Sequence, residues 1–314
     1  MKIFHQQELP PEPWSQPVLS LGNFDGVHLG HRRILERLVQ RARQVGGEAV
    51  VATFHPHPAR ILRPDRAPLP LISLQDRLGA LKEAGAEGLW VIPFDEAFAR
   101  REAGDFVREC LVSRLGIQGL VLGPDARLGR DRRGGPDLLR DLGAELDFFV
   151  EVVPDVELDG ERISSTRIRQ VLREGRVEHA ARLLGRSYRL RGEVSLGHRR
   201  GRRLGFPTAN LKVEDLQLPG HGIYACRAFL EDSRGEAREL ECVTSIGVRP
   251  TFDNGPVTVE AHLLDFDENI YGHLLTLEFV RKLREERKFP SVEALVEAMY
   301  RDVADTRRVL AGFL

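Results

Sequence analysis

The sequence predicts two domains, an N-terminal α/β domain built on a parallel sheet and a C-terminal antiparallel β-barrel that ends in a helix. In the first half of the 314 residues, four short and nearly unbroken apolar runs alternate with helical patterns, at 18–24, 48–54, 88–94 and 119–123. Buried strands separated by helices are typical of a parallel sheet covered on both faces. In the second half, five strand-like runs follow one another without helices between them, which favours an antiparallel sheet or barrel.

The clearest helix of the first half is expected at 32–47. Its apolar residues recur at helical spacing and form one stripe, made by Ile34, Leu35, Leu38, Val39, Ala42 and Val45. Gly46 and Gly47 are expected to end it, since glycine readily adopts the conformation that closes a helix. A further helix, expected at 165–185, closes this half of the chain.

The strands of the second half are expected at 189–196, 222–230, 240–248, 257–266 and 274–283. In the run from 257, apolar residues alternate with Thr258, Glu260 and His262, so these three should share one face of the sheet. A last helix is expected from about Pro290, with an apolar face formed by Val292, Leu295, Val296, Met299 and Val303. Near Gly185 the pattern changes from strands that alternate with helices to strands that follow one another. We therefore expect domains at 1–184 and 185–314.

The composition predicts a cytoplasmic protein, and we further expect one that acts on small molecules as a monomer or a weak oligomer. The 46 basic and 47 acidic side chains nearly cancel, which argues against nucleic acid or a membrane surface as the partner. No apolar run approaches the roughly 20 residues that span a bilayer, and the N-terminus lacks the apolar core of a signal peptide. The three cysteines, Cys110, Cys226 and Cys242, form no CxxC pair, which fits a reducing compartment.

The stretch GNFDGVHLGH, at 22–31, is the first candidate site. It leaves a strand and enters the first long helix, a setting in which backbone N–H groups and the helix dipole attract an anion. His28 and His31 admit three interpretations: ordinary packing, zinc ligation or contact with a phosphate. Zinc lacks a third ligand in the sequence, because there is no HExxH motif and no cysteine cluster. The HxGH spacing directly after a strand favours the phosphate.

A second candidate phosphate contact lies at the start of the helix at 165–185, in RISSTRIR (162–169). Ser164, Ser165 and Thr166 offer hydroxyl groups and helix N-terminal amides, and Arg167 and Arg169 supply positive charge. Taken alone, the segment is more typical of an ordinary capped helix; together with the HxGH motif, it favours a phosphate contact.

The second half has a candidate site of its own, in GEVSLGHRRGRRLGFPTANL at 192–211. Its four arginines, at 199, 200, 202 and 203, are most simply a solvated loop, and so short a basic run is weak support for nucleic-acid binding. The glycines would let the backbone approach phosphates closely. Thr208 and Asn210 carry the oxygen atoms that a hard cation prefers.

These motifs resemble, in order, those of the bacterial bifunctional riboflavin kinase/FAD synthetases. GNFDGVHLGH, TFHPHP (53–58), GPDARLGR (123–130) and RISSTRIR are similar to the motifs of the adenylyltransferase module, which belongs to the nucleotidyltransferase superfamily with its Rossmann-type sheet. GFPTAN, VTVEAHLLDF and LREERKF are similar to those of the riboflavin kinase module, as are SIGVRPTF and DENIYG. The resemblance covers nearly the whole chain.

The resemblance implies two reactions. The C-terminal domain would use ATP to phosphorylate riboflavin to FMN, and the N-terminal domain would transfer AMP from ATP to FMN, giving FAD and pyrophosphate. The implied catalytic residues are Glu260, as the kinase base, and His28 and His31. The implied metal is Mg²⁺, held by Thr208 and Asn210, and His57, Pro58, Thr251 and Arg284 would border the flavin. The implied contacts to ATP and its phosphates are Gly22, Asn23, Phe24, Asp25, Gly26, Gly30, Asp125, Arg162, Ser164, Ser165, Thr166, Arg167, Arg169, Gly197, Gly201, Gly205 and Pro207.

One motif departs from the family. Ala126 and Leu128 stand where aromatic residues are usual, and the loss of two rings would weaken stacking or packing beside a bound ring system. The alternative is therefore a riboflavin kinase whose adenylyltransferase domain is weakened or inactive. A flavin- or nucleotide-binding regulator without catalysis is the alternative from another class, and the intact Glu260, Thr208, Asn210 and HxGH motif speak against it.

Overall fold

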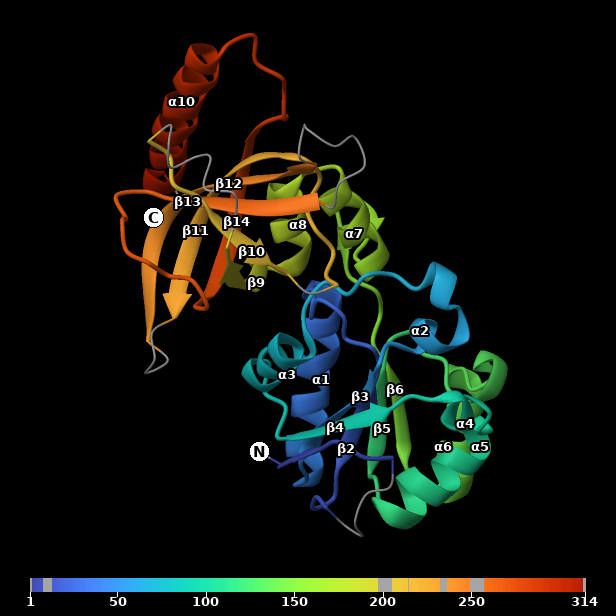
Figure 1. The fold of residues 1–314 in the computed structure, drawn as a ribbon. Coiled ribbons are helices and arrows are strands. Elements are labelled where there is room, and N and C mark those ends of the chain that lie inside the picture. Colours follow the sequence, from blue (N-terminus) through green and yellow to red (C-terminus); the bar gives the residue numbers. More distant parts are fainter. Residues whose placement is uncertain are drawn as a thin grey trace. The chain divides into compact units, whose positions relative to one another are not determined.

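The computed structural model describes residues 2–7, 13–196, 205–213, 215–231, 236–248 and 257–312. The chain divides into two compact units, Met1–Ser164 and Ser165–Leu314. Figure 1 shows an α/β unit in the blue to green part of the chain and a β-rich unit in the yellow to red part.

The first unit confirms the predicted parallel sheet. Six strands lie in the order β1-β4-β3-β2-β5-β6, and every pairing between them is parallel. The strands are β1 (Lys2–Phe4), β2 (Val18–Leu21), β3 (Ala49–His55), β4 (Gly88–Pro93), β5 (Gly119–Leu122) and β6 (Phe149–Val152). After β2 the chain adds β3 and β4 on one side, whereas β5 and β6 lie on the other. The boundary between β2 and β5 is thus the point at which the order of the sheet reverses.

Helices cover both faces of this sheet, and each face has its own apolar core. One core is formed with α1 (Leu29–Val45) and α3 (Leu74–Glu83), the other with η2 (Phe106–Arg114) and α6 (Pro136–Leu146). Figure 1 shows α1 and α3 together on one side of the sheet and α4 to α6 on the other. The remaining short elements are α2 (Pro58–Leu62), η1 (Pro64–Arg66), α4 (Glu96–Ala99), α5 (Ala103–Asp105), η3 (Arg130–Arg132), β7 (Glu157–Leu158) and β8 (Glu161–Arg162).

The second unit confirms the predicted barrel. Its strands close in the order β10-β13-β12-β11-β14-β9, with antiparallel pairing throughout. They are β9 (Tyr188–Ser195), β10 (Ala209–Lys212), β11 (Gly222–Glu231), β12 (Ala237–Val248), β13 (Val257–Leu263) and β14 (Leu274–Arg284), followed by α10 (Val292–Ala311). Along β13, Val259, Ala261 and Leu263 are buried in the interior. Glu260 and its two polar neighbours therefore lie on the outer face, as their alternation predicts.

The helix expected at 165–185 is two helices, α7 (Ser165–Arg173) and α8 (Val177–Leu184). Gly175 separates them with φ of 73°, and a Cβ there would lie only 2.7 Å from Nζ of Lys282. The left-handed backbone favours a glycine in the middle of the apolar pattern, and the side chains of Lys282 and Tyr224 leave little room for a Cβ there. α8 packs on β9 and β14, so α7 and α8 group with the barrel in the second unit. The consecutive strands of the barrel, by contrast, begin only after Gly185.

The structure also describes the state of the three cysteines and the length and hydropathy of the helices. Cys110, Cys226 and Cys242 are buried free thiols. No helix within the described ranges is both long enough and apolar enough to cross a bilayer.

Candidate active sites

The HxGH motif lies where the order of the parallel sheet reverses. Gly22 follows the carboxyl end of β2, and Gly123, the first residue of the GPDARLGR motif, follows the carboxyl end of the adjacent β5. In open α/β sheets, ligands bind outside the carboxyl ends of the strands at such a reversal point. Two motifs about a hundred residues apart are thereby brought to one edge of the first unit.

The turn between β2 and α1 has an unusual backbone. Phe24, Gly26 and Val27 have φ of 46°, 84° and 39°, in the left-handed region. A branched side chain such as Val27 is rarely found there, and each such residue costs on the order of 1–3 kcal/mol unless its surroundings fix it. Val27 and Phe24 are both buried, and the ring of Phe24 lies where a Cβ on Gly22 would crowd it at 3.2 Å. Packing thus holds a turn that its own sequence does not favour.

His28 has two roles in this turn. It is the N-cap of α1, and its Nδ1 accepts a hydrogen bond from the backbone N–H of His31 at 3.2 Å. In a neutral imidazole whose Nδ1 accepts, the proton is on Nε2. That N–H is therefore the donor His28 can offer a ligand. Gly30 lies against the ring, because a Cβ there would be 3.2 Å from it, so the HxGH glycine makes room for the first histidine.

His31 is held neutral by its surroundings. Its ring stacks on His28 with centroids 3.6 Å apart and contacts Phe24 at 5.2 Å. Burial lowers the pKa of His31 well below its usual value, and the nearby His28 and Arg77 lower it further. Its Nδ1 is buried without a hydrogen-bond partner among the residues that the structure describes.

The pKa of His31 predicts a pH dependence of stability. Above pH 6.5 the ring is neutral in the folded and unfolded chain, whereas below it the unfolded chain takes up the proton first. The free energy of unfolding should therefore fall as the pH drops from about 7 to about 5, by at most about 1.4 kcal/mol per pH unit from this one group. Urea unfolding at several pH values measures the slope. His31→Gln should flatten it, and an unchanged slope in this variant would contradict the assignment.

Arg77, on α3, is a residue of this site that the sequence analysis missed. It is buried, and its guanidinium donates to the backbone carbonyls of Asn23, at 2.8 Å, and Phe54, at 3.2 Å. It thereby joins the turn after β2 to the end of β3. No sequence signal identified it, because an arginine in a capped helix such as SLQDRLGALKE is ordinarily solvated.

Asp25 anchors the turn from the other side. Its buried carboxylate accepts a hydrogen bond from the backbone N–H of Leu71 at 2.9 Å. The structure thus gives Asp25 a supporting contact within the protein, and its predicted contact with ATP stays a prediction.

The TFHPHP motif lies at the end of β3, beside the HxGH turn. His57 is the N-cap of α2, with Nδ1 accepting from the N–H of Ala59 at 3.1 Å, and Pro58 is the first residue of that helix. The His55 residue is largely exposed, yet partial desolvation of its ring, together with the nearby positive charge of Arg77, lowers its pKa.

In the third motif, Asp125 is held by Arg162. The two side chains form an ion pair at 2.7 Å, and Arg162 also pairs with Asp155 at 3.0 Å. The charge of Arg162 is thus already balanced within the protein.

The two residues that depart from the family pattern lie in the apolar core. Leu128 is buried in it, and Ala126 packs against it. Around them four rings, Phe54, Phe94, Phe98 and Phe106, contact one another at 5.5–6.0 Å. The missing rings at 126 and 128 thus fall at core positions of an aromatic-rich region, and the predicted weakening of packing beside a bound ring stays a prediction.

The segment at the start of α7 belongs to the second unit from Ser165 onward. Arg169 is buried, and Nη2 of Arg167 lies 3.3 Å from Nε2 of His179 on α8. The predicted phosphate contacts of Ser164, Ser165, Thr166 and these two arginines stay predictions.

The outer face of the barrel carries a row of polar side chains, one from each of four adjacent strands. Asn210 on β10 lies opposite Glu260 on β13 and, on its other side, opposite Ser195 on β9. Glu260 in turn lies opposite Ser245 on β12. Directly paired residues share one face of a sheet, so the alternation of the strands brings these four side chains together. We call Ser195, Asn210, Glu260 and Ser245 the polar row.

The GFPTAN segment is fixed beside the middle of this row, to which its Asn210 belongs. Oγ1 of Thr208 lies 3.4 Å from Oε2 of Glu260, and Nδ1 of His262 lies 2.8 Å from the carbonyl oxygen of Pro207. The ring of Phe206 contacts His262 and Tyr300, while Gly205 has φ of 84°. Gly197, Gly201, Thr251 and the arginines at 199–203 lie outside the described residues.

Arg284 is committed to a contact inside the second unit. It makes two hydrogen bonds to the buried carboxylate of Asp302 on α10, at 2.8 and 2.7 Å. Its predicted contact with the flavin stays a prediction.

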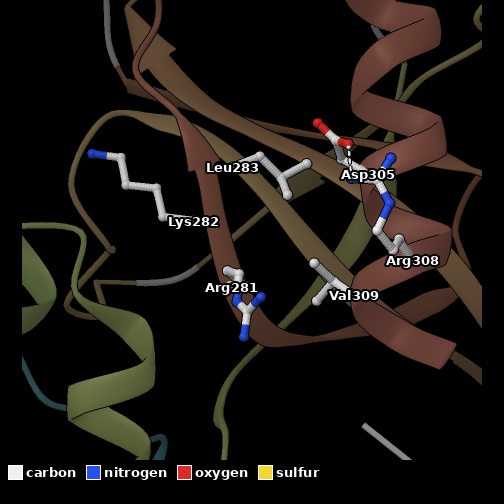
Figure 2. Close-up of a pocket in the computed structure, with 6 residues that line it drawn as sticks. All are labelled: Arg281, Lys282, Leu283, Asp305, Arg308 and Val309. Atoms are coloured by element: carbon white, nitrogen blue, oxygen red, sulfur yellow. Dashed lines mark ion pairs between the residues drawn. The ribbon is translucent and has the colours of Figure 1, made fainter. Parts of the chain in front are cut away.

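A separate cavity of about 240 Å³ lies between β14 and α10. Figure 2 shows Arg281 and Leu283 facing Arg308 and Val309, with Lys282 pointing away. The three cations that line the cavity are already paired. Arg281 pairs with Glu178 at 3.5 Å, Lys282 with Glu285 at 2.7 Å, and Arg308 with Asp305 at 3.0 Å. It therefore offers little net charge to an anion.

The chain combines a parallel-sheet domain that carries the HxGH turn with a barrel that carries an oxygen-rich row, an arrangement typical of a two-domain transferase. Comparison with family models gives a match to FAD synthetase at residues 11–167 and to riboflavin kinase at residues 184–310. The bifunctional riboflavin kinase/FMN adenylyltransferase of Pseudomonas fluorescens is 39% identical over 94% of this chain and 93% of its own length. The enzymes of the same description from Bacillus subtilis (34%) and Escherichia coli K12 (35%) each match over at least 94% of both chains.

A solved structure is also similar, that of a protein from Streptococcus pneumoniae described as a macrolide-efflux protein. It has a TM-score of 0.83 and 30% identity, and the match covers 97% of this chain and 99% of that one. The chain thus belongs to the family of bifunctional riboflavin kinase/FMN adenylyltransferases. It carries both the FAD synthetase and the riboflavin kinase domain, as the motifs predict, and it is an enzyme of the transferase class.

Proposed function

We propose that the barrel phosphorylates riboflavin on its 5′-hydroxyl at the polar row. Glu260 is the base that takes the proton of this hydroxyl as the oxygen attacks the γ-phosphorus of ATP; ADP leaves and FMN is the product. The single observation that carries this assignment is the position of Glu260, whose carboxylate lies 3.4 Å from Thr208 and directly opposite Asn210. Gly205 and Pro207, and Gly197 and Gly201 of the preceding loop, contact the ATP phosphates.

Mg²⁺ fits the donor atoms of this site. A hydroxyl, an amide and a carboxylate oxygen come together from Thr208, Asn210 and Glu260, and such oxygen donors suit a hard cation. Within the described residues, no group of three or more His, Cys, Asp or Glu side chains forms a metal site, so the ion would rely on Thr208, Asn210, water and ATP. When bound, Mg²⁺ supplies positive charge to the transferring phosphoryl group.

The α/β domain transfers AMP from ATP to FMN at the HxGH turn. The FMN phosphate attacks the α-phosphorus and pyrophosphate leaves, so the site needs positioning and charge stabilisation rather than a base. The Nε2–H of His28 donates to the phosphates, and neutral His31, stacked on it, fixes its ring. The turn from Gly22 to Gly30, Asp125, Arg162 and the segment 164–169 hold ATP. His57 and Pro58 border the flavin in this site, as Thr251 and Arg284 do in the kinase site.

The functional modules are 1–184 and 185–314, and the enzyme works in the cytoplasm as a monomer or weak oligomer without nucleic acid. Three buried free thiols support a reducing compartment.

The test is to incubate the protein with riboflavin, ATP and Mg²⁺ and to separate the flavins over time. FMN should appear first and FAD should follow. FMN without FAD, at high enzyme concentration and long times, would favour a riboflavin kinase with an inactive first domain. Riboflavin binding without release of ADP or pyrophosphate would favour a non-catalytic regulator.

A further inference from the structure

The outer face of the barrel holds a second carboxylate beside the polar row. Gly247 lies two residues beyond Ser245 on β12 and therefore on the same face. The carboxylate of Glu286, which follows β14, occupies the place that a side chain at 247 would take, since a Cβ on Gly247 would overlap it. The absence of a side chain at Gly247 therefore leaves the space that the Glu286 carboxylate occupies.

Glu286 is linked to Glu260 through Ser245. The hydroxyl of Ser245 donates to Oε1 of Glu286 at 3.5 Å, and Ser245 lies directly opposite Glu260. Partial burial raises the pKa of Glu286, with His221, Ser245 and Arg284 opposing the rise and the carboxylate of Glu260 adding to it. The carboxylates of Glu260 and Glu286 therefore repel each other electrostatically across one patch of the sheet.

The neighbours of Glu286 in sequence are engaged differently. Glu285 pairs with Lys282 at 2.7 Å, and Arg284 pairs with Asp302. Within the described part of the chain, no lysine or arginine lies within ion-pair distance of Glu286. Two like charges close together are unfavourable unless hydrogen-bond donors satisfy them. A substrate rich in hydroxyl groups provides such donors.

We propose that Glu286 binds a non-reacting hydroxyl of the ribityl chain, while the reacting 5′-hydroxyl faces Glu260. This inference rests on the proposed role of Glu260. Riboflavin carries four hydroxyls on that chain, and only one of them is phosphorylated. A carboxylate that accepts from a second hydroxyl would fix the chain at two points and so orient the attacking oxygen.

The test compares two substrates that share the reacting group. Riboflavin is compared with a flavin that carries a 5-hydroxypentyl chain, which retains the terminal hydroxyl and lacks the other three. Glu286→Ala should lower kcat/KM for riboflavin by about 10- to 100-fold and leave that for the hydroxypentyl flavin within about 2-fold. Quenching of flavin fluorescence gives the same comparison for binding where turnover of the analogue is slow. Glu285→Ala is the matched control and should change neither substrate.

Gly247→Ala supplies an independent arm, because it displaces Glu286 without removing it. Gly247→Ala should reproduce the selective loss of kcat/KM for riboflavin. The double variant Gly247→Ala/Glu286→Ala should show no larger loss than either single variant. Equal losses on both flavins, or no loss on riboflavin, would overturn the proposal. Glu260→Gln should lower turnover of both flavins by about 10²- to 10⁴-fold, so near-native turnover in that variant would instead refute the kinase mechanism on which the proposal rests.

Discussion

Glu260→Gln is expected to lower riboflavin phosphorylation by about 10²- to 10⁴-fold, the usual contribution of a positioned general base. Glutamine has nearly the shape of glutamate and retains an oxygen that can accept from Thr208, 3.4 Å away in the native protein. The variant thus removes the proton acceptor with little change in packing. The measurement is the rate of ADP release with riboflavin and ATP as substrates.

The same variant should adenylylate supplied FMN at the native rate, because Glu260 lies on the barrel and the HxGH turn lies on the parallel sheet. Glu239→Gln, on β12 and paired with Arg227 at 3.4 Å, is the control for loss of a carboxylate from the barrel and should retain both activities. If Glu260→Gln is folded and has lost both reactions, the assignment of separate sites is wrong.

His28→Asn is expected to lower formation of FAD from supplied FMN by about 10²- to 10³-fold, the usual cost of removing one preorganised donor to developing charge. Asparagine is a good N-cap, so the contact that His28 makes with the N–H of His31 is replaced and α1 keeps its start. What the variant lacks is the Nε2–H beyond the cap. Pyrophosphate release with FMN and ATP measures the loss.

Two controls separate chemistry from stability. Ser73→Ala removes the N-cap of α3 and should lower the free energy of unfolding by roughly 1 kcal/mol while leaving both rates unchanged. In His28→Asn, riboflavin phosphorylation should also be native. Native FAD formation in His28→Asn would show that the histidine serves only as a cap.

The elements of the fold could be predicted largely from local pattern. The apolar runs around β2 to β5 and the alternation along β13 each report burial on their own strand. The break at Gly175 was not predicted, because its left-handed backbone, beside Lys282 from a strand about a hundred residues later, is set by tertiary structure.

The site residues likewise fall into those that lie in contiguous motifs and those that only tertiary contacts bring to the site. Motifs such as HxGH and GFPTAN are contiguous, so their chemistry is visible in sequence. Arg77 and Glu286 are positioned by tertiary contacts, Arg77 through the carbonyls of Asn23 and Phe54 and Glu286 by the space that Gly247 leaves. Ala126 and Leu128 show the same limit from the other side, because their missing rings suggested a weakened ligand site, and that effect on the ligand stays a prediction. The core position of these residues could be recognised only once the strands were packed.

The most direct test of two independent sites on one chain is complementation between the two variants. Glu260→Gln and His28→Asn are each incubated with riboflavin, ATP and Mg²⁺, separately and as a mixture, and FAD is measured. Each variant alone should make little FAD, His28→Asn should accumulate FMN, and the mixture should form FAD because FMN released by one chain is adenylylated by the other. A mixture that makes no more FAD than either variant alone, although both are folded, would contradict the presence of two independent sites.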